Sequence, residues 1–304
     1  MYNQNAGYIF ESNIDKINWS SLSKNNDKNM IYFFEKNLDK VNWFNFSGNP
    51  NAIHLLEENL DKIYWPLLSQ NPNAIHILEK NLDKIDWERL SLNPNAIHLL
   101  EKNLEKVNWK YLSTNLNAMK IIENNLDKVD WYWLSMNPNA ISIIEKNLDK
   151  VDWTTLGANI NAIHIIEKNL DKISWNRLSW NHNAIHILKK NFDKIDWVKL
   201  SRNINAIDIL EENIEKINWY CLSFNENAIR IIENNLNNAR LCDLAFNKNA
   251  IHILIQFDRD KMREQMAPLK KELLEYVFHP LRLRRLCDRL SVDLATLLDQ
   301  YQLT

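Results

Sequence analysis

Residues Asn71 to Leu92 read NPNAIHILEKNLDKIDWERLSL, and near-copies of this 22-residue string fill most of the 304-residue chain. The copies are easiest to follow by their tryptophans, which recur every 22 residues after a first interval of 24. These tryptophans are Trp19, Trp43, Trp65, Trp87, Trp109, Trp131, Trp153, Trp175, Trp197 and Trp219. Self-similarity at a fixed period of this length indicates a repeat architecture, so the chain is an array of stacked units.

Each repeat is predicted to form two helices of unequal length. Asn71 suits the cap of the first helix, and Pro72 suits its first position, where a missing N–H costs nothing. The apolar residues that follow have the spacing of one helical face; they are Ala74, Ile75, Leu78, Leu82 and Ile85. Asp86 is then a second cap, and it starts a shorter element over residues 87–91.

Neither helix can bury its apolar face alone, so neighbouring repeats must stack into a continuous core. We therefore predict an all-α fold: an elongated, superhelical α-solenoid of about eleven repeats over residues 1–257, with a helical C-terminal cap over residues 258–304. The ten tryptophans are expected to form the structural core, one above another. The arginines of the tail are interpreted as the polar face of the cap, with binding of a phosphate or an acidic group as the alternative; they are Arg282, Arg285 and Arg289.

Composition places the chain among soluble, non-secreted proteins. The formal net charge is −2, which gives no global attraction to nucleic acid or to an anionic membrane. Three cysteines without C-x-x-C spacing make neither a disulfide framework nor a zinc site, so we expect an intracellular, reducing compartment. The start of the chain lacks the features of a signal peptide, and no apolar run is long enough for a membrane span.

The unit NPNAIH(L/I)LEKNLDK(I/V)DWxxLS resembles the Asn-rich short repeats of proteins encoded by giant DNA viruses of amoebae, over about residues 3–250. The segment 276–283 is similar to segments that close repeat proteins in those viruses. The resemblance implies an α-solenoid without an assigned activity, in the host cytoplasm or the virion, and it implies no catalytic residues. The architecture also resembles leucine-rich-variant solenoids, which pair a helix with a shorter helical element.

The residues disfavour an enzyme, a cofactor or a metal site. Only three glycines occur, Gly7, Gly48 and Gly157, and their positions fit neither a phosphate-binding loop nor a nucleophile elbow. Six histidines share one repeat position, but stacked repeats would hold them about 10 Å apart, too far for one ion. We interpret them as a solvated stripe.

The informative positions are those that vary while the framework repeats, namely the two residues after each tryptophan and the last residue of the unit. Their variety suggests exposure, and their aromatic and arginine content is typical of protein interfaces. We predict one partner-binding surface from Tyr111, Tyr132, Trp133, Met136, Arg177, Trp180, Lys199, Tyr220 and Phe224. Neutral drift or packing between repeats is the alternative interpretation of these positions.

These observations favour a non-enzymatic scaffold or adaptor that binds another protein, with the short Trp-led element lining the concave side. One alternative is a structural component of the virion. Another is a helical-repeat reader of nucleic acid, which the negative net charge and the acidic helices disfavour because phosphate contacts need a basic groove.

Overall fold

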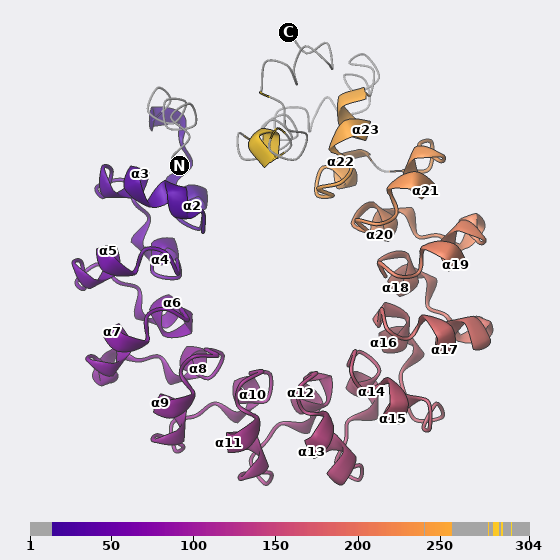
Figure 1. Ribbon diagram of the computed structural model, residues 1–304, viewed down its shortest axis with the longest axis horizontal. Helices are drawn as coiled ribbons and strands as arrows, with labels where there is room; N and C mark the ends of the chain where they lie inside the picture. Colours follow the sequence, from indigo (N-terminus) through magenta and orange to yellow (C-terminus); the bar gives the residue numbers. More distant parts are fainter. Residues whose placement is uncertain are drawn as a thin grey trace. The chain divides into compact units, whose positions relative to one another are not determined.

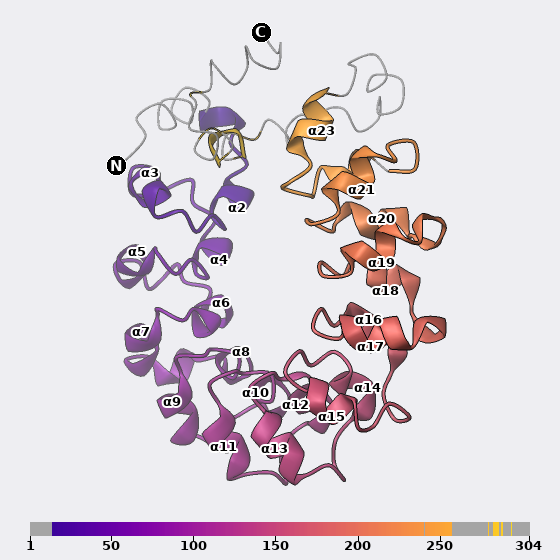
Figure 2. The same ribbon diagram turned by 45° about the vertical axis from the view of Figure 1, so that its right-hand side comes forward.

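The computed structural model describes residues 14–239, 241–256, 279, 282–285, 287 and 293. The described residues form short helices joined by turns, with no strand among them. The chain divides into two parts, Met1–Thr155 and Leu156–Thr304, which we call the N-terminal array and the C-terminal array. In each array, pairs of helices repeat and pack in sequence, which confirms the all-α solenoid (Figures 1 and 2).

One helix of each pair begins at the tryptophan, and we call it the Trp-led helix. In the N-terminal array the Trp-led helices are α2 (Trp19–Leu22), α4 (Trp43–Phe46), α6 (Trp65–Gln70), α8 (Trp87–Leu90), α10 (Trp109–Leu112) and α12 (Trp131–Met136). In the C-terminal array they are α16 (Trp175–Trp180), α18 (Trp197–Ser201) and α20 (Trp219–Ser223), with α22 (Leu241–Leu244) in the eroded repeat. The helix α14 (Trp153–Leu156) contains the boundary between the two arrays.

The other helix of each pair lies on the opposite side of the stack, and we call it the outer helix. The outer helices are α3 (Ile31–Glu35), α5 (Ile53–Glu57), α7 (Ile75–Glu79), α9 (Ile97–Glu101), α11 (Met119–Glu123), α13 (Ile141–Lys146), α15 (Ile163–Ile166), α17 (Ile185–Lys190), α19 (Ile207–Glu211), α21 (Ile229–Glu233) and α23 (Ile251–Gln256). Single 3₁₀ turns complete the elements: η1 (Ile14–Lys16), η2 (Lys28–Met30), η3 (Leu82–Lys84), η4 (Phe192–Lys194) and η5 (Ile214–Lys216). Figure 1 shows the Trp-led helices on the inner side of the curve that each array describes.

The caps of the two helices differ from each other. Asp86 caps α8 as predicted, because its Oδ1 accepts the Arg89 N–H at 2.9 Å. Asn71 does not cap the outer helix, which begins only at Ile75, so that prediction was wrong. The predicted single helix over 74–85 also breaks after Glu79. Its last turn is interrupted because the Asn81 side chain donates to the Ile77 carbonyl at 2.8 Å, in competition with the helical backbone bonds.

The innermost layer of the core consists of aliphatic residues from both helices. The residue three places after each tryptophan is buried, and Leu90 and Leu112 have no exposed surface. An alanine precedes each outer helix from α5 onward and is fully buried, as Ala96 is, and its small side chain lets neighbouring repeats approach closely. Two further aliphatic residues of the outer helix, such as Leu99 and Leu100, complete the layer.

The tryptophans lie at the edge of this core. All ten are only partly buried, which corrects the prediction that they form the innermost column; they are Trp19, Trp43, Trp65, Trp87, Trp109, Trp131, Trp153, Trp175, Trp197 and Trp219. At least seven of these rings carry a lysine ammonium from the following repeat over one face, at 4.8 Å for Lys106 over Trp87 and up to 5.8 Å for Lys150 over Trp131. Each of these indoles therefore contacts the apolar core on one side and a solvated lysine ammonium on the other.

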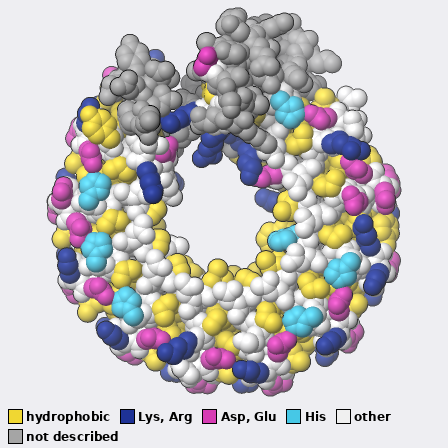
Figure 3. All heavy atoms as spheres, viewed as in Figure 1, with side chains coloured by type: hydrophobic (Ala, Val, Ile, Leu, Met, Phe, Trp, Pro, Cys, Tyr) yellow, Lys and Arg dark blue, Asp and Glu magenta, His cyan; other side chains and the backbone are white. Residues whose placement is uncertain are grey.

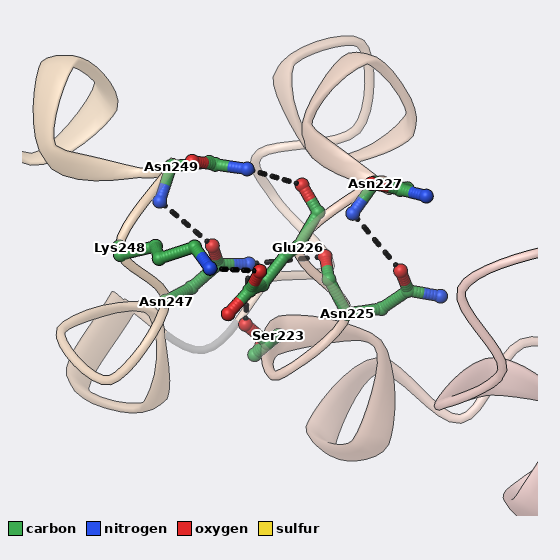
Figure 4. Close-up of polar contacts among 7 residues, drawn as sticks. All are labelled: Ser223, Asn225, Glu226, Asn227, Asn247, Lys248 and Asn249. Atoms are coloured by element: carbon green, nitrogen blue, oxygen red, sulfur yellow. Dashed lines mark hydrogen bonds and ion pairs between the residues drawn. The ribbon is translucent and has the colours of Figure 1, made fainter. Parts of the chain in front are cut away.

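A ladder of buried asparagines connects successive repeats. From Asn49 onward, the first asparagine of each repeat is almost fully buried. In most of these repeats its amide donates to two backbone carbonyls, 22 and 24 residues earlier in the chain. Figure 4 shows one rung, in which Asn247 Nδ2 donates to the Ser223 and Asn225 carbonyls at 3.0 Å each. Its Oδ1 accepts the Asn249 N–H at 3.0 Å, and Asn249 Nδ2 donates to the Glu226 carbonyl at 2.9 Å. Buried backbone groups between repeats thus find partners in side chains.

A buried serine makes a second connection between repeats. Ser69 Oγ donates to the Trp65 carbonyl at 2.9 Å and accepts the N–H of Asp86, in the next repeat, at 3.0 Å. Gly157 occupies this serine position once. A Cβ there would lie 3.1 Å from the Ser174 carbonyl oxygen and 3.3 Å from the Arg177 Cβ, which explains why the repeat departs from serine at this point.

The histidine position is more structured than a solvated stripe. At least five of these histidines lie 2.7–3.0 Å from a glutamate of the preceding repeat. The pairs are His54–Glu35, His76–Glu57, His98–Glu79, His186–Glu167 and His252–Glu233. These pairs lie on the solvent side of the outer helices, so each adds little to stability. Each pair joins the same two repeat positions in neighbouring repeats.

The predicted cap over residues 258–304 lies almost entirely outside the described residues, as does the Leu241 side chain. Of the tail arginines, Arg282 donates to the Ala245 carbonyl at 2.5 Å, which ties the tail to α22. Arg289 is outside the described residues. Among the residues that the structure describes, no helix is both long and apolar enough to cross a bilayer.

Candidate partner-binding face

The Trp-led helix holds its fixed residues toward the core and its variable residues toward the inner side of each array. In α16, Leu178 and Ser179 are fully buried, whereas Trp180 is 50% exposed. The same pattern in α20 leaves Tyr220 48% exposed beside a buried Leu222. We call the side of each array that carries these variable residues the inner face.

All nine residues of the predicted surface lie on or directly after Trp-led helices, and none belongs to the fully buried core. Tyr111, Tyr132, Trp133 and Met136 belong to the N-terminal array. Arg177, Trp180, Lys199, Tyr220 and Phe224 belong to the C-terminal array. Tyr132, Trp180, Lys199 and Tyr220 are exposed, and the other five are partly buried. The nine residues fall into two clusters, one in each array.

In the N-terminal array the variable residues contact one another. Tyr132 and Trp133 pack edge to face with ring centroids 5.2 Å apart. The Lys110 ammonium lies 5.8 Å from the Tyr111 ring and 5.6 Å from the Trp133 ring, so it connects α10 to α12. The partly buried Trp133 is therefore held by neighbours on both sides, unlike the half-exposed Trp180.

In the C-terminal array, α16, α18 and α20 together form a groove of about 420 Å³. Its lining comprises Asn176, Arg177, Trp180, Val198, Lys199, Arg202 and Cys221. The groove continues the predicted surface, because it contains Arg177, Trp180 and Lys199. It joins an aromatic cluster through Arg202, whose guanidinium lies 5.0 Å from the Phe224 ring.

Charge is distributed unevenly over the two sides of each array. Figure 3 shows acidic and histidine side chains mainly along the side of the outer helices, whereas the inner face is largely apolar or uncharged with a few cations. Most acidic side chains therefore lie away from the inner face, except for residues such as Asp196, which caps a Trp-led helix, and Glu88, at a variable position. Net charge alone was a poor guide to this face.

Sequence reasoning missed several residues of the inner face. Arg202 lines the groove, and Phe246 stacks on Phe224 with centroids 5.9 Å apart and is 60% exposed. Both occupy the last position of a repeat, as Trp180 does, so the periodic position was the signal that could have found them. Phe44, 53% exposed, lies 4.4 Å from the Tyr64 ring and borders a second groove in the N-terminal array.

The pKa of the Cys221 thiol depends on its burial and on the charges that surround the groove. Burial raises the pKa of Cys221, and the nearby Arg202 and Lys199 partly oppose this by favouring the thiolate. The thiol is therefore mostly protonated near neutral pH. A protonated thiol is a weak nucleophile, so we assign Cys221 no chemical role.

We expect iodoacetamide to alkylate Cys221 more slowly than a free cysteine peptide at pH 8, because a raised pKa leaves less thiolate at that pH. Mass spectrometry in a Cys242→Ser/Cys287→Ser background measures the rate against pH. Adding Lys199→Gln and Arg202→Gln should move the midpoint to still higher pH, since both cations lower the pKa. A midpoint at or below that of the free peptide would contradict this electrostatic description.

The described part of the chain contains no candidate metal site. No group of three or more histidine, cysteine, aspartate or glutamate side chains there could hold a metal ion. The histidines instead contact glutamates in pairs, as described above. Comparison with known proteins found no matching family model, no matching curated protein and no matching solved structure.

Proposed function

We propose that this chain is a non-enzymatic scaffold that binds another protein through the inner face of its Trp-led helices. The observation that carries the proposal is the exposure of large aromatic side chains at variable positions of a fixed frame. Trp180 is 50% exposed, Tyr220 48% and Tyr132 39%. Tryptophan, tyrosine and arginine are the residues most enriched at the energetic centres of protein interfaces.

The distribution of polar groups supports the same proposal. The buried asparagines and serines at fixed positions already form hydrogen bonds to the backbone between repeats, so their polar groups are not available to a ligand. Ligand contacts therefore fall to the variable residues, which differ from repeat to repeat and could match the shape of one partner. The resemblance to giant-virus repeat proteins extends this proposal to a viral protein acting in the reducing interior of the host cell or in the virion.

We expect Trp180→Ala to weaken partner capture at least about tenfold, as loss of an interface anchor does, while leaving thermal stability nearly unchanged. Capture from a lysate of the amoebal host, quantified by mass spectrometry against the wild-type chain, measures the first effect. Calorimetry measures the second. Trp133→Ala should weaken capture too, but its partly buried ring will also lower stability.

Phe192→Leu is the matched control on the outer side of the same array. Phe192 is 40% exposed in η4, where the equivalent position of other repeats holds leucine, as Leu82 does in η3. This change removes an exposed aromatic ring without departing from the repeat pattern, so capture should be preserved. Equal capture by the wild-type, Trp180→Ala and Phe192→Leu chains would overturn the proposed face.

A further inference from the structure

The groove of the C-terminal array concentrates positive charge. Arg177 reaches it from α16, Lys199 lies on α18, and Arg202 follows α18 directly. No aspartate or glutamate lines it. Three cations from two neighbouring Trp-led helices therefore share a space of about 420 Å³.

The carboxylate of Asp196, which caps α18, does not pair with the Lys199 ammonium or the Arg202 guanidinium. Asp196 uses Oδ1 to accept the Lys199 backbone N–H at 3.1 Å, as the cap of α18. Its Oδ2 accepts from Asn176 Nδ2 at 2.5 Å. Among the described residues, neither Lys199 nor Arg202 forms an ion pair with a carboxylate. Like charges in one groove repel each other, and an anionic ligand would relieve that repulsion.

Apolar surface lies beside the cations. Trp180 is 50% exposed and Val198 is 45% exposed, and both line the groove. Arg202 also packs over Phe224, so its guanidinium is held in place by an aromatic ring. The groove thus offers a flat apolar contact surrounded by positioned donors for carboxylate oxygens.

The amount of charge favours a short peptide over nucleic acid. A nucleic-acid strand carries one phosphate per nucleotide and needs a continuous track of cations. The groove supplies three cations, and the variable positions of the N-terminal array add a mixture of signs, with Glu88 beside Arg89. A few carboxylates next to one apolar side chain match the groove better.

We infer that this groove binds an acidic segment of the partner protein, with carboxylates on Arg177, Lys199 and Arg202 and one apolar side chain on Trp180. This inference rests on the proposed scaffold function and adds the chemical class of the ligand. Binding would be driven by charge-assisted hydrogen bonds, so its affinity should fall as salt is added.

The test uses a fluorescein-labelled decapeptide with glutamates on both sides of one central leucine, titrated by anisotropy with the full chain. We expect saturable binding to the wild-type chain and at least about tenfold weaker binding to Lys199→Gln/Arg202→Gln, which keeps two methylenes of each side chain but removes two charges. The matched control is Lys168→Gln/Lys190→Gln, two exposed lysines of the outer side with the same change in net charge. Its affinity should stay within about twofold of the wild-type value, because these charges lie outside the groove.

Three results would overturn the inference. They are equal weakening by both double variants, undiminished binding when glutamine replaces every glutamate of the peptide, and tighter binding of an oligouridylate of the same length. The lysate capture separates this inference from the proposed function. Loss of capture by Trp180→Ala but not by Lys199→Gln/Arg202→Gln would support the scaffold function and contradict the acidic ligand. Unchanged capture by both variants would contradict the scaffold function itself.

Discussion

Asn93→Ala is expected to lower the free energy of unfolding by about 3–5 kcal/mol, because it removes three hydrogen bonds worth roughly 1–1.5 kcal/mol each from a site without exposed surface. Asn93 Nδ2 donates to the Ser69 carbonyl at 3.0 Å and to the Asn71 carbonyl at 2.9 Å. Its Oδ1 accepts the Asn95 N–H at 3.0 Å. Urea unfolding followed by far-ultraviolet circular dichroism measures the loss.

Asn95→Ala is the control for this prediction. Asn95 is exposed and donates one side-chain bond across repeats, to the Pro72 carbonyl at 2.9 Å, so its loss should cost only about 0.5–1 kcal/mol. Asn93→Asp should destabilise at least as much as Asn93→Ala, because it places a carboxylate oxygen against two carbonyl oxygens. Equal costs for the Asn93 and Asn95 alanine variants would show that the buried ladder does not hold the repeats together.

The second large effect is expected at the aliphatic core. Leu112→Ala should destabilise the chain by about 2–5 kcal/mol, since Leu112 is fully buried and its truncation leaves a sealed cavity. Trp109→Ala should cost no more than this, although it deletes a larger side chain. Trp109 is only partly buried under Lys128, so water and the lysine stem can fill the space that it leaves.

Chemical denaturation of the two variants, compared at one denaturant concentration near the transition, ranks them directly. Comparison at one concentration matters because long repeat arrays do not always unfold in a single step. A clearly larger loss for Trp109→Ala than for Leu112→Ala would restore the tryptophans as the principal source of stability and contradict the core described above.

Much of the fold was predictable because the repeat period and the capping residues are visible in the sequence. The 22-residue period indicated stacked helix pairs, and Asp86 indicated the start of the Trp-led helix. The role of Asn71 was not predictable from local rules, because its partners lie 22 and 24 residues earlier in the chain. It looked like a helix cap, whereas its amide bridges to the carbonyls of Ser47 and Asn49 at 3.3 and 3.1 Å.

The tryptophans were misplaced for a related reason. Periodicity shows that a residue faces the stack, but it does not show how deep that residue lies. Trp87 is large enough to reach the core edge while one face stays under Lys106, and only packing in three dimensions reveals this. The candidate face was predictable to the extent that variability indicates exposure, as at Trp180. The grouping of Arg177, Lys199 and Arg202 required the structure, because they come from adjacent repeats.

The fixed positions of the repeat hold the fold together, and we propose that the variable ones recognise the partner. Urea unfolding of two adjacent variants, Trp180→Ala and Asn181→Ala, tests this division most directly. Trp180 is half exposed on the inner face, whereas Asn181 is 2% exposed and donates to the Gly157 and Asn159 carbonyls. We predict an unchanged urea midpoint for Trp180→Ala and a strongly lowered one for Asn181→Ala; similar midpoints for both variants would contradict the account.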